Sequence, residues 1–99
     1  MPLNVELRDE HGSAMAQIVG VTGLWTLPSL AENDRIMIRF VDPYGDTIFN
    51  RLQAAELCIE LIPLPSSLPA DERTVIESIV ELAQRCAAEV HTYLWFIGD

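Results

Sequence analysis

The sequence has no lysine, so all six of its basic side chains are arginines. This absence excludes a Schiff-base lysine, a phosphate-loop lysine and a lysine general base. The motifs GxSxG, HExxH, CxxC, GxGxxG and Walker A are absent as well. The two histidines, His11 and His91, fall in different predicted elements and lack the spacing of zinc ligands. The sequence therefore predicts no catalytic residue, no metal site and no cofactor.

Long apolar runs and targeting signals are also missing. No uncharged apolar stretch reaches the roughly 18 residues that a membrane span needs, and the first residues, MPLNVELRDEHG, lack the basic and apolar regions of a signal peptide. Cys58 and Cys86 both fall in apolar helical patterns, which favours reduced core thiols over a disulfide. We expect a cytoplasmic protein that does not interact with membranes.

Acidic residues outnumber basic ones, 15 to 6, which gives a net charge of −9. The acids are spread over both halves of the chain, so the whole molecule is acidic. Such a field repels nucleic acid and attracts basic proteins, although it also serves solubility. The apolar content of 49% argues against disorder, and 99 residues suit a single domain, residues 1–99.

Alternating apolar and polar residues predict an antiparallel sheet in the first half of the chain. Its four expected strands are residues 4–9, 14–21, 35–41 and 47–50. His11 and Gly12 supply the reversal between the first two strands. Residues 20–34, with two glycines and a proline, predict a connection.

The stretch DPYGDTIFNRLQ, residues 42–53, predicts a turn followed by a helix start. Asp42 is expected to bind the turn backbone, and Gly45 to take a positive φ. Asn50 and Gln53 have the spacing of a capping box.

Tyr44 and Asp46 are the two residues of this stretch that have no structural role in this interpretation. An exposed tyrosine beside carboxylates at a turn is a candidate contact for a partner. The alternative is that both side chains belong to a solvated turn.

The helix after Asn50 is predicted to end before Pro63. Its apolar residues recur with helical spacing, so we expect an inward stripe of Leu52, Ala55, Ile59 and Ile62. Glu56 and Glu60 are expected to form a like-charged pair on the exposed face.

A second, longer helix is predicted over residues 69–97. Ser66 and Ser67 are candidate caps, and an apolar stripe runs from Ile76 to Ile97 at spacings of three and four. VHTYLWFI alone is typical of a strand, but the stripe continues through it and no glycine or proline interrupts it. Gly98 stands where a helix C-terminal glycine is expected.

Trp95 and Phe96 lie on the polar side of this predicted helix, at its far end. A helix of about 43 Å exceeds the expected domain size, so its end is expected to contact a partner, such as a second copy of the chain. In the alternative, both aromatic rings pack back onto the sheet.

The strings FVDPYGDTIFNRLQ and FIGD resemble a pattern of small uncharacterised bacterial proteins with a DPYGDTxFN-type motif. The resemblance covers about a fifth of the chain. It implies a bacterial source and transfers no activity and no functional residue.

The sequence thus predicts an α+β fold, a four-stranded antiparallel sheet followed by two helices of which the C-terminal one is long. Without catalytic motifs, we expect a non-enzymatic acidic interaction module that forms a homodimer and binds a basic protein through Tyr44, Asp46, Trp95 and Phe96. The alternative is a small ligand-binding protein or enzyme with a pocket between the sheet and the helices.

Overall fold

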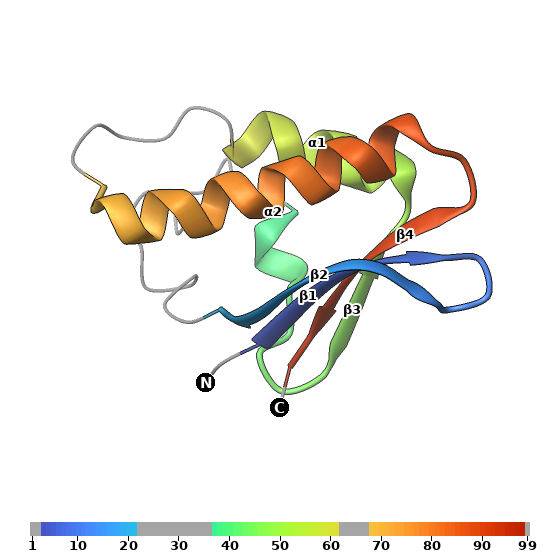
Figure 1. Cartoon of the computed structure of the whole chain (residues 1–99), viewed down its shortest axis with the longest axis horizontal. Coiled ribbons are helices and arrows are strands. Elements are labelled where there is room, and N and C mark those ends of the chain that lie inside the picture. The colour runs from blue at the N-terminus through green and yellow to red at the C-terminus, as the bar shows by residue number, and fades with distance from the viewer. Residues whose placement is uncertain (1–2, 22–36, 62–67, 99) are drawn as a thin grey trace.

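Four antiparallel strands form one sheet in the order β2-β1-β4-β3 (Figure 1). The strands are β1 (Leu3–Asp9), β2 (Ala14–Val21), β3 (Asp46–Phe49) and β4 (Thr92–Ile97). This computed structural model describes residues 3–21, 37–61 and 68–98. Most of the predicted connection at 20–34 and both candidate cap serines lie outside the described residues.

Two helices, α1 (Arg51–Leu61) and α2 (Ala70–Ala88), pack together on one face of the sheet (Figure 1). Their inward side chains and those of the strands form one apolar core. The buried residues are Leu3, Val5, Leu7, Val21, Ile38, Val41, Phe49, Ala54, Leu57, Cys58, Leu61, Ile76, Ile79, Leu82, Ala83, Cys86, Leu94 and Phe96. The α+β class, the four-stranded antiparallel sheet and the long second helix are confirmed.

Strand β4 lies in the middle of the sheet, between β1 and β3. Its side chains alternate, so that Leu94 and Phe96 are fully buried while Tyr93 and Trp95 point to the other face. The Phe96 ring meets Phe49 of β3 edge to face, with 5.7 Å between ring centres. Strand β4 therefore links β3 to β1 through its hydrogen bonds, and its inward side chains form part of the core.

The prediction of one helix over residues 69–97 is wrong, because α2 ends at Ala88. The predicted stripe holds within α2, where Ile76, Ile79, Leu82, Ala83 and Cys86 are buried. After it, the chain reverses at His91, which takes φ 61°. Thr92 completes the turn, since its hydroxyl donates to the carbonyl oxygens of Cys86 and Glu89 at 3.2 and 2.9 Å. The β-branched and aromatic residues that follow form the central strand.

Gly98 has a different role from the predicted helix end. Its amide donates to the carbonyl oxygen of Gly45 at 2.8 Å. A Cβ at Gly98 would lie 2.5 Å from the Pro43 carbonyl oxygen, so only glycine permits this approach. The turn at residues 42–45 and the residue after β4 are thus packed backbone to backbone.

The predicted strand over residues 35–41 is also wrong for its described part, where Ile38–Phe40 form a 3-10 helix. Glu60 of α1 explains the turn, because its carboxylate accepts the amide of Met37 at 2.8 and 2.9 Å and that of Ile38 at 3.4 Å. The Glu60 side chain is buried, whereas Glu56 is exposed, so the predicted exposed pair is corrected. A carboxylate at the start of a helical turn stabilises it by accepting free amides.

Helix α1 packs with a different face from the predicted one. Leu52 and Ile59 are about two-thirds exposed, at 65% and 66%, and the buried side is Ala54, Leu57, Cys58 and Leu61. Both sets of residues have helical spacing, because polar residues divide the helix surface into two apolar sides. Ile62 lies outside the described residues.

The turn and cap of residues 42–53 are confirmed in most respects. The Asp42 carboxylate accepts the Tyr44 amide at 2.8 Å. The Asn50 side chain accepts the Gln53 amide at 2.9 Å, and the Gln53 side chain accepts the Asn50 amide at 3.0 Å, which is a capping box. Gly45 does not take the predicted positive φ.

The predicted hairpin between the first two strands is confirmed, with its reversal at His11 and Gly12. Gly12 takes φ 84° there. Strand β2 is an edge strand, and two register shifts interrupt its pairing with β1. Bulges of this kind discourage an edge strand from pairing with another chain.

Candidate functional site

The face of the sheet opposite the helices carries exposed aromatic and aliphatic side chains. We call this surface the open face, because none of the described helices packs on it. Tyr93 and Trp95 of β4 lie beside Ile48 of β3, and Trp95 is paired with both Ile48 and Glu6 in the sheet register. Ile48 is 47% exposed and Tyr93 36% exposed. These adjoining side chains make the open face a candidate contact surface.

Arg8 of β1 lies over Trp95 at the centre of the open face. Its guanidinium carbon is 4.1 Å from the centre of the indole ring, which is a cation–π contact. The Arg8 Nε donates to a carboxylate oxygen of Glu6 at 2.8 Å. Glu6 thereby balances the charge of Arg8, and the indole ring is held in one orientation.

A shallow hollow lies at the end of the open face where β1 turns into β2, and we call it the hairpin pocket. Its volume is about 450 Å³. Its lining is Asp9, Glu10, His11, Gly12, Ile48, Tyr93 and Trp95. The strands supply apolar and aromatic walls, and the hairpin turn supplies two carboxylates.

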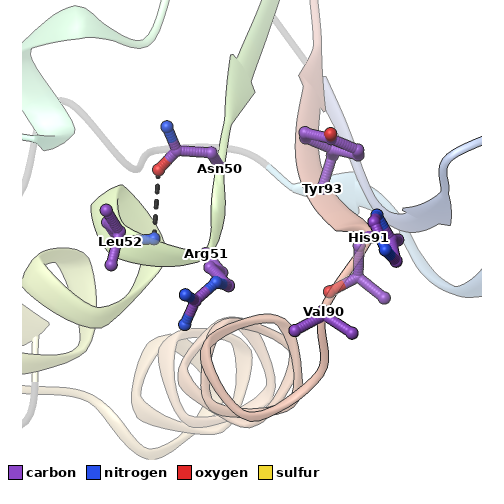
Figure 2. A pocket seen from close by; sticks show the side chains of 7 residues that line it. Asn50, Arg51, Leu52, Val90, His91 and Tyr93 are labelled. Carbon is purple, nitrogen blue, oxygen red and sulfur yellow. Dashed lines mark hydrogen bonds between the residues drawn. The ribbon is translucent and has the colours of Figure 1, made fainter.

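A second hollow, the cap pocket, lies at the same end of the sheet but beside the helices (Figure 2). Asn50, Arg51 and Leu52 at the start of α1 line one side, and the turn before β4 lines the other with Val90 and His91. Its volume is about 370 Å³, and Tyr93 belongs to both pockets. The Asn50 Oδ1 already accepts the amides of Leu52 and Gln53, so this oxygen is used by the helix cap.

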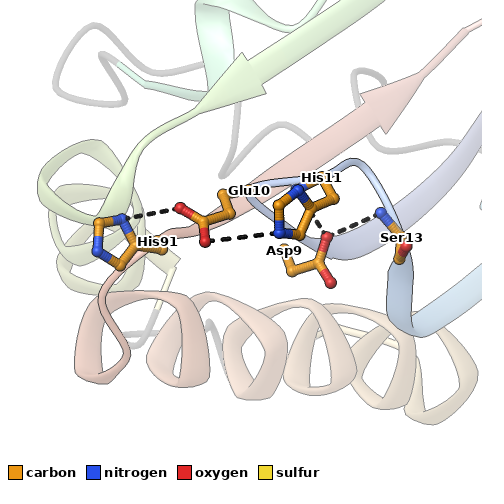
Figure 3. Close-up of polar contacts among 5 residues, drawn as sticks. All are labelled: Asp9, Glu10, His11, Ser13 and His91. Atoms are coloured by element: carbon orange, nitrogen blue, oxygen red, sulfur yellow. Dashed lines mark hydrogen bonds and ion pairs between the residues drawn. The ribbon is translucent and has the colours of Figure 1, made fainter.

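Glu10 lies between the two histidines (Figure 3). Its carboxylate oxygens are 3.4 Å from Nδ1 of His91 and 3.7 Å from Nε2 of His11. These residues meet because β1 pairs with β4, which places Asp9 opposite Thr92 and brings the turns after each strand end together. This contact could not be predicted from the sequence, since the three residues belong to two distant turns.

Asp9 shapes the hairpin turn beside Glu10 (Figure 3). Its Oδ1 accepts the amide of Ser13 at 3.0 Å and the amide of His11 at 2.9 Å. The hydrogen bond from Ser13 is the main cause that lowers the pKa of the Asp9 carboxyl below its ordinary value. Asp9 therefore carries its negative charge throughout the neutral range.

The predicted contact residues are only partly brought together. Asp46 and Trp95 both belong to the open face, because Asp46 pairs with Ile97 at the far end of β3 and β4. Tyr44 is 69% exposed on the neighbouring turn. Phe96 is fully buried on the helix-facing side of β4, so its side chain does not reach the surface, and it lies within the sheet rather than packing back onto it from a helix.

Both cysteines are buried and free, and burial raises the pKa of the Cys58 and Cys86 thiols, so neither is an activated nucleophile. Across residues 3–21, 37–61 and 68–98, no three His, Cys, Asp or Glu residues form a group that holds a metal ion. In the same part of the chain, no helix has the length and apolarity needed to cross a membrane.

Comparison with protein families, with curated proteins and with solved structures finds no match to this chain. Function is therefore inferred from the chemistry of the open face and its two pockets.

Proposed function

We propose that this protein is a non-enzymatic, acidic interaction module that docks a basic protein on the open face of its sheet. The observation that supports this proposal is the row of exposed Ile48 and Tyr93 with half-buried Trp95, which is bordered by carboxylates. An apolar centre with a charged rim is the usual anatomy of a protein interface.

Charge favours a basic partner. The molecule carries −9, and the open face is bordered by Asp46 at one end and Glu10 at the other. Arg8 adds little positive potential because Glu6 is hydrogen-bonded to it. A cationic partner gains from this field both in association rate and in specificity.

A homodimer is the second arrangement to consider. The sequence predicted a dimer because aromatic residues were expected at the end of an overhanging helix. That reason no longer holds, because α2 ends at Ala88 and Trp95 lies in the sheet. Two copies facing each other through the open face would oppose acidic rims of like charge. We therefore place the basic partner first and treat self-association as an outcome to be measured.

The alternative of a ligand-binding protein or enzyme needed a pocket between the sheet and the helices. Among the described residues, that interface is filled by core side chains such as Leu7, Ile79 and Leu94. The hairpin pocket and the cap pocket both lie outside it and are shallow, whereas small-molecule sites bury most of their ligand. A surface contact for a protein suits these features better.

A cytoplasmic location in a bacterium accompanies this proposal. The two buried free thiols suit a reducing compartment. The bacterial source is implied by the DPYGDTxFN-type motif, residues 42–50.

The proposal is tested by capture from a bacterial lysate with two matched variants. Ile48→Lys and Ile59→Lys exchange the same residue type at exposed positions, one on the open face and one on α1. We expect the wild type and Ile59→Lys to retain basic proteins at low salt and release them at high salt, while Ile48→Lys retains little. Equal capture by both variants would exclude the open face.

Sedimentation of the purified protein at low and high salt measures self-association separately. We expect a monomer at low salt, because the copies repel each other. A stable dimer that the Ile48→Lys change dissociates would assign the open face to a second copy instead.

A further inference from the structure

We propose that the hairpin pocket receives one arginine side chain of the basic partner and thereby selects that partner. This inference rests on the proposed function and deepens it, because it names the group that the open face recognises. The pocket combines an aromatic floor, an aliphatic wall and two carboxylates in one hollow.

The walls of the pocket match the stem of a long cationic side chain. Ile48, Tyr93 and Trp95 supply apolar surface from two neighbouring strands. Arginine and lysine place their methylene groups along such surface while the charged head reaches polar groups. The hollow is shallow and open, which suits a side chain delivered by a protein better than an enclosed small molecule.

The carboxylates lie where the head group would be placed. Asp9 and Glu10 both line the pocket from the hairpin turn. The Asp9 carboxylate accepts the backbone amides of His11 and Ser13, and Asp9 stays ionised at neutral pH. Glu10 lies at the rim between the two histidine rings, with its carboxylate oxygens 3.4 Å from Nδ1 of His91 and 3.7 Å from Nε2 of His11.

Arginine fits this pocket better than lysine. A guanidinium is planar, stacks on aromatic rings and pairs with carboxylates through several donors, whereas an ammonium is a compact, strongly hydrated charge. The protein already contains one such contact, since the Arg8 guanidinium lies 4.1 Å from the centre of the Trp95 ring. Because Arg8 already lies over the Trp95 ring, Tyr93 is the ring on which the partner's guanidinium would stack.

Three small probes test the pocket without any partner protein. N-acetyl-arginine amide, N-acetyl-lysine amide and the neutral isostere N-acetyl-citrulline amide are titrated into the labelled protein, and amide and indole chemical shifts are followed by NMR. We expect the arginine probe to shift the signals of residues 9–12 and the Trp95 indole. The lysine probe should bind more weakly, and the citrulline probe should cause no saturable shift.

Two double variants separate local from global charge. Asp9→Asn with Glu10→Gln removes both pocket carboxylates, and asparagine retains the acceptor of the turn. Glu56→Gln with Glu77→Gln makes the same change in net charge at exposed helical positions. We expect the first pair to weaken the arginine probe roughly tenfold and the second pair less than twofold.

Three results would overturn the proposal: equal shifts from the arginine and citrulline probes, binding of lysine as tight as that of arginine, or shifts confined to the cap pocket. The first two comparisons use only the wild type, so they hold even if a variant folds poorly. The lysate experiment does not depend on the probe titrations. Capture of a basic protein together with a failed arginine titration would therefore refute the pocket assignment and leave the proposed function of the open face in place.

Discussion

Glu60→Ala is expected to destabilise the protein strongly, although the residue lies on a surface helix. Its buried carboxylate accepts the Met37 amide with both oxygens at 2.8 and 2.9 Å, and the Ile38 amide at 3.4 Å. A hydrogen bond to a charged group contributes about 1.5–3 kcal/mol, and buried amides left without an acceptor cost a similar amount. The bond to Met37 is short and the bond to Ile38 is long, so we expect a loss of about 3 kcal/mol.

Urea unfolding followed by tryptophan fluorescence measures this loss. With a slope of roughly 1.5 kcal/mol per molar urea, the midpoint should fall by about 2 M. Glu60→Gln keeps one oxygen acceptor, so it should lose about half as much. Glu56→Ala is the matched control, because Glu56 is an exposed glutamate one turn earlier in α1, and its effect should stay within about 0.5 kcal/mol.

The Met37 amide proton provides a second, local measurement. In the wild type it should resonate downfield and exchange slowly with solvent, and both properties should disappear in Glu60→Ala. If Glu60→Ala is as mild as Glu56→Ala, water replaces the carboxylate at these amides. The stabilisation of the 3-10 helix by Glu60 would then have to be abandoned.

Three further changes test the packing of the chain. Asn50→Ala should lower the free energy of unfolding by about 1 kcal/mol in urea titrations, because it removes the helix cap, and no change would refute the cap's contribution. Gly98→Ala should cost roughly 1–3 kcal/mol in the same assay, since the new Cβ would meet the Pro43 backbone; an unaffected midpoint would show that the two segments separate easily. A thiol reagent at pH 8 should modify Cys58 and Cys86 slowly in the native protein and rapidly in denaturant, because burial raises both thiol pKa values and blocks access; rapid native reaction would contradict their burial.

Several features followed from the sequence because they depend on neighbouring residues. The capping box of Asn50 and Gln53 and the hairpin reversal at Gly12 involve contacts within a few positions. The stripe of α2 was also recognisable, because its charged residues mark one side clearly. Where hydrogen bonds are local, or a helix has only one apolar side, the local sequence is enough to predict the structure of that segment.

Other features were decided by tertiary contacts. Residues 92–97 have both a helical and a strand-like pattern, and the strand forms because β1 and β3 supply hydrogen-bonding partners on both sides. Helix α1 has two apolar sides of similar strength, so only its packing against α2 and the sheet determines which one is buried. Where local patterns allow two solutions, long-range packing selects between them.

The candidate site also combines features that the sequence predicted with features that tertiary contacts decided. The acidic charge and the tryptophan in the last strand were visible in the sequence, and Trp95 proved to lie on the surface that the proposal uses. The hairpin pocket was not visible, because Glu10 and Tyr93 come together only through the pairing of β1 with β4. Composition therefore determined the net charge on which the proposed basic partner rests, whereas the sheet register, set by backbone hydrogen bonds between distant segments, decided where Tyr93, Trp95 and Glu10 meet.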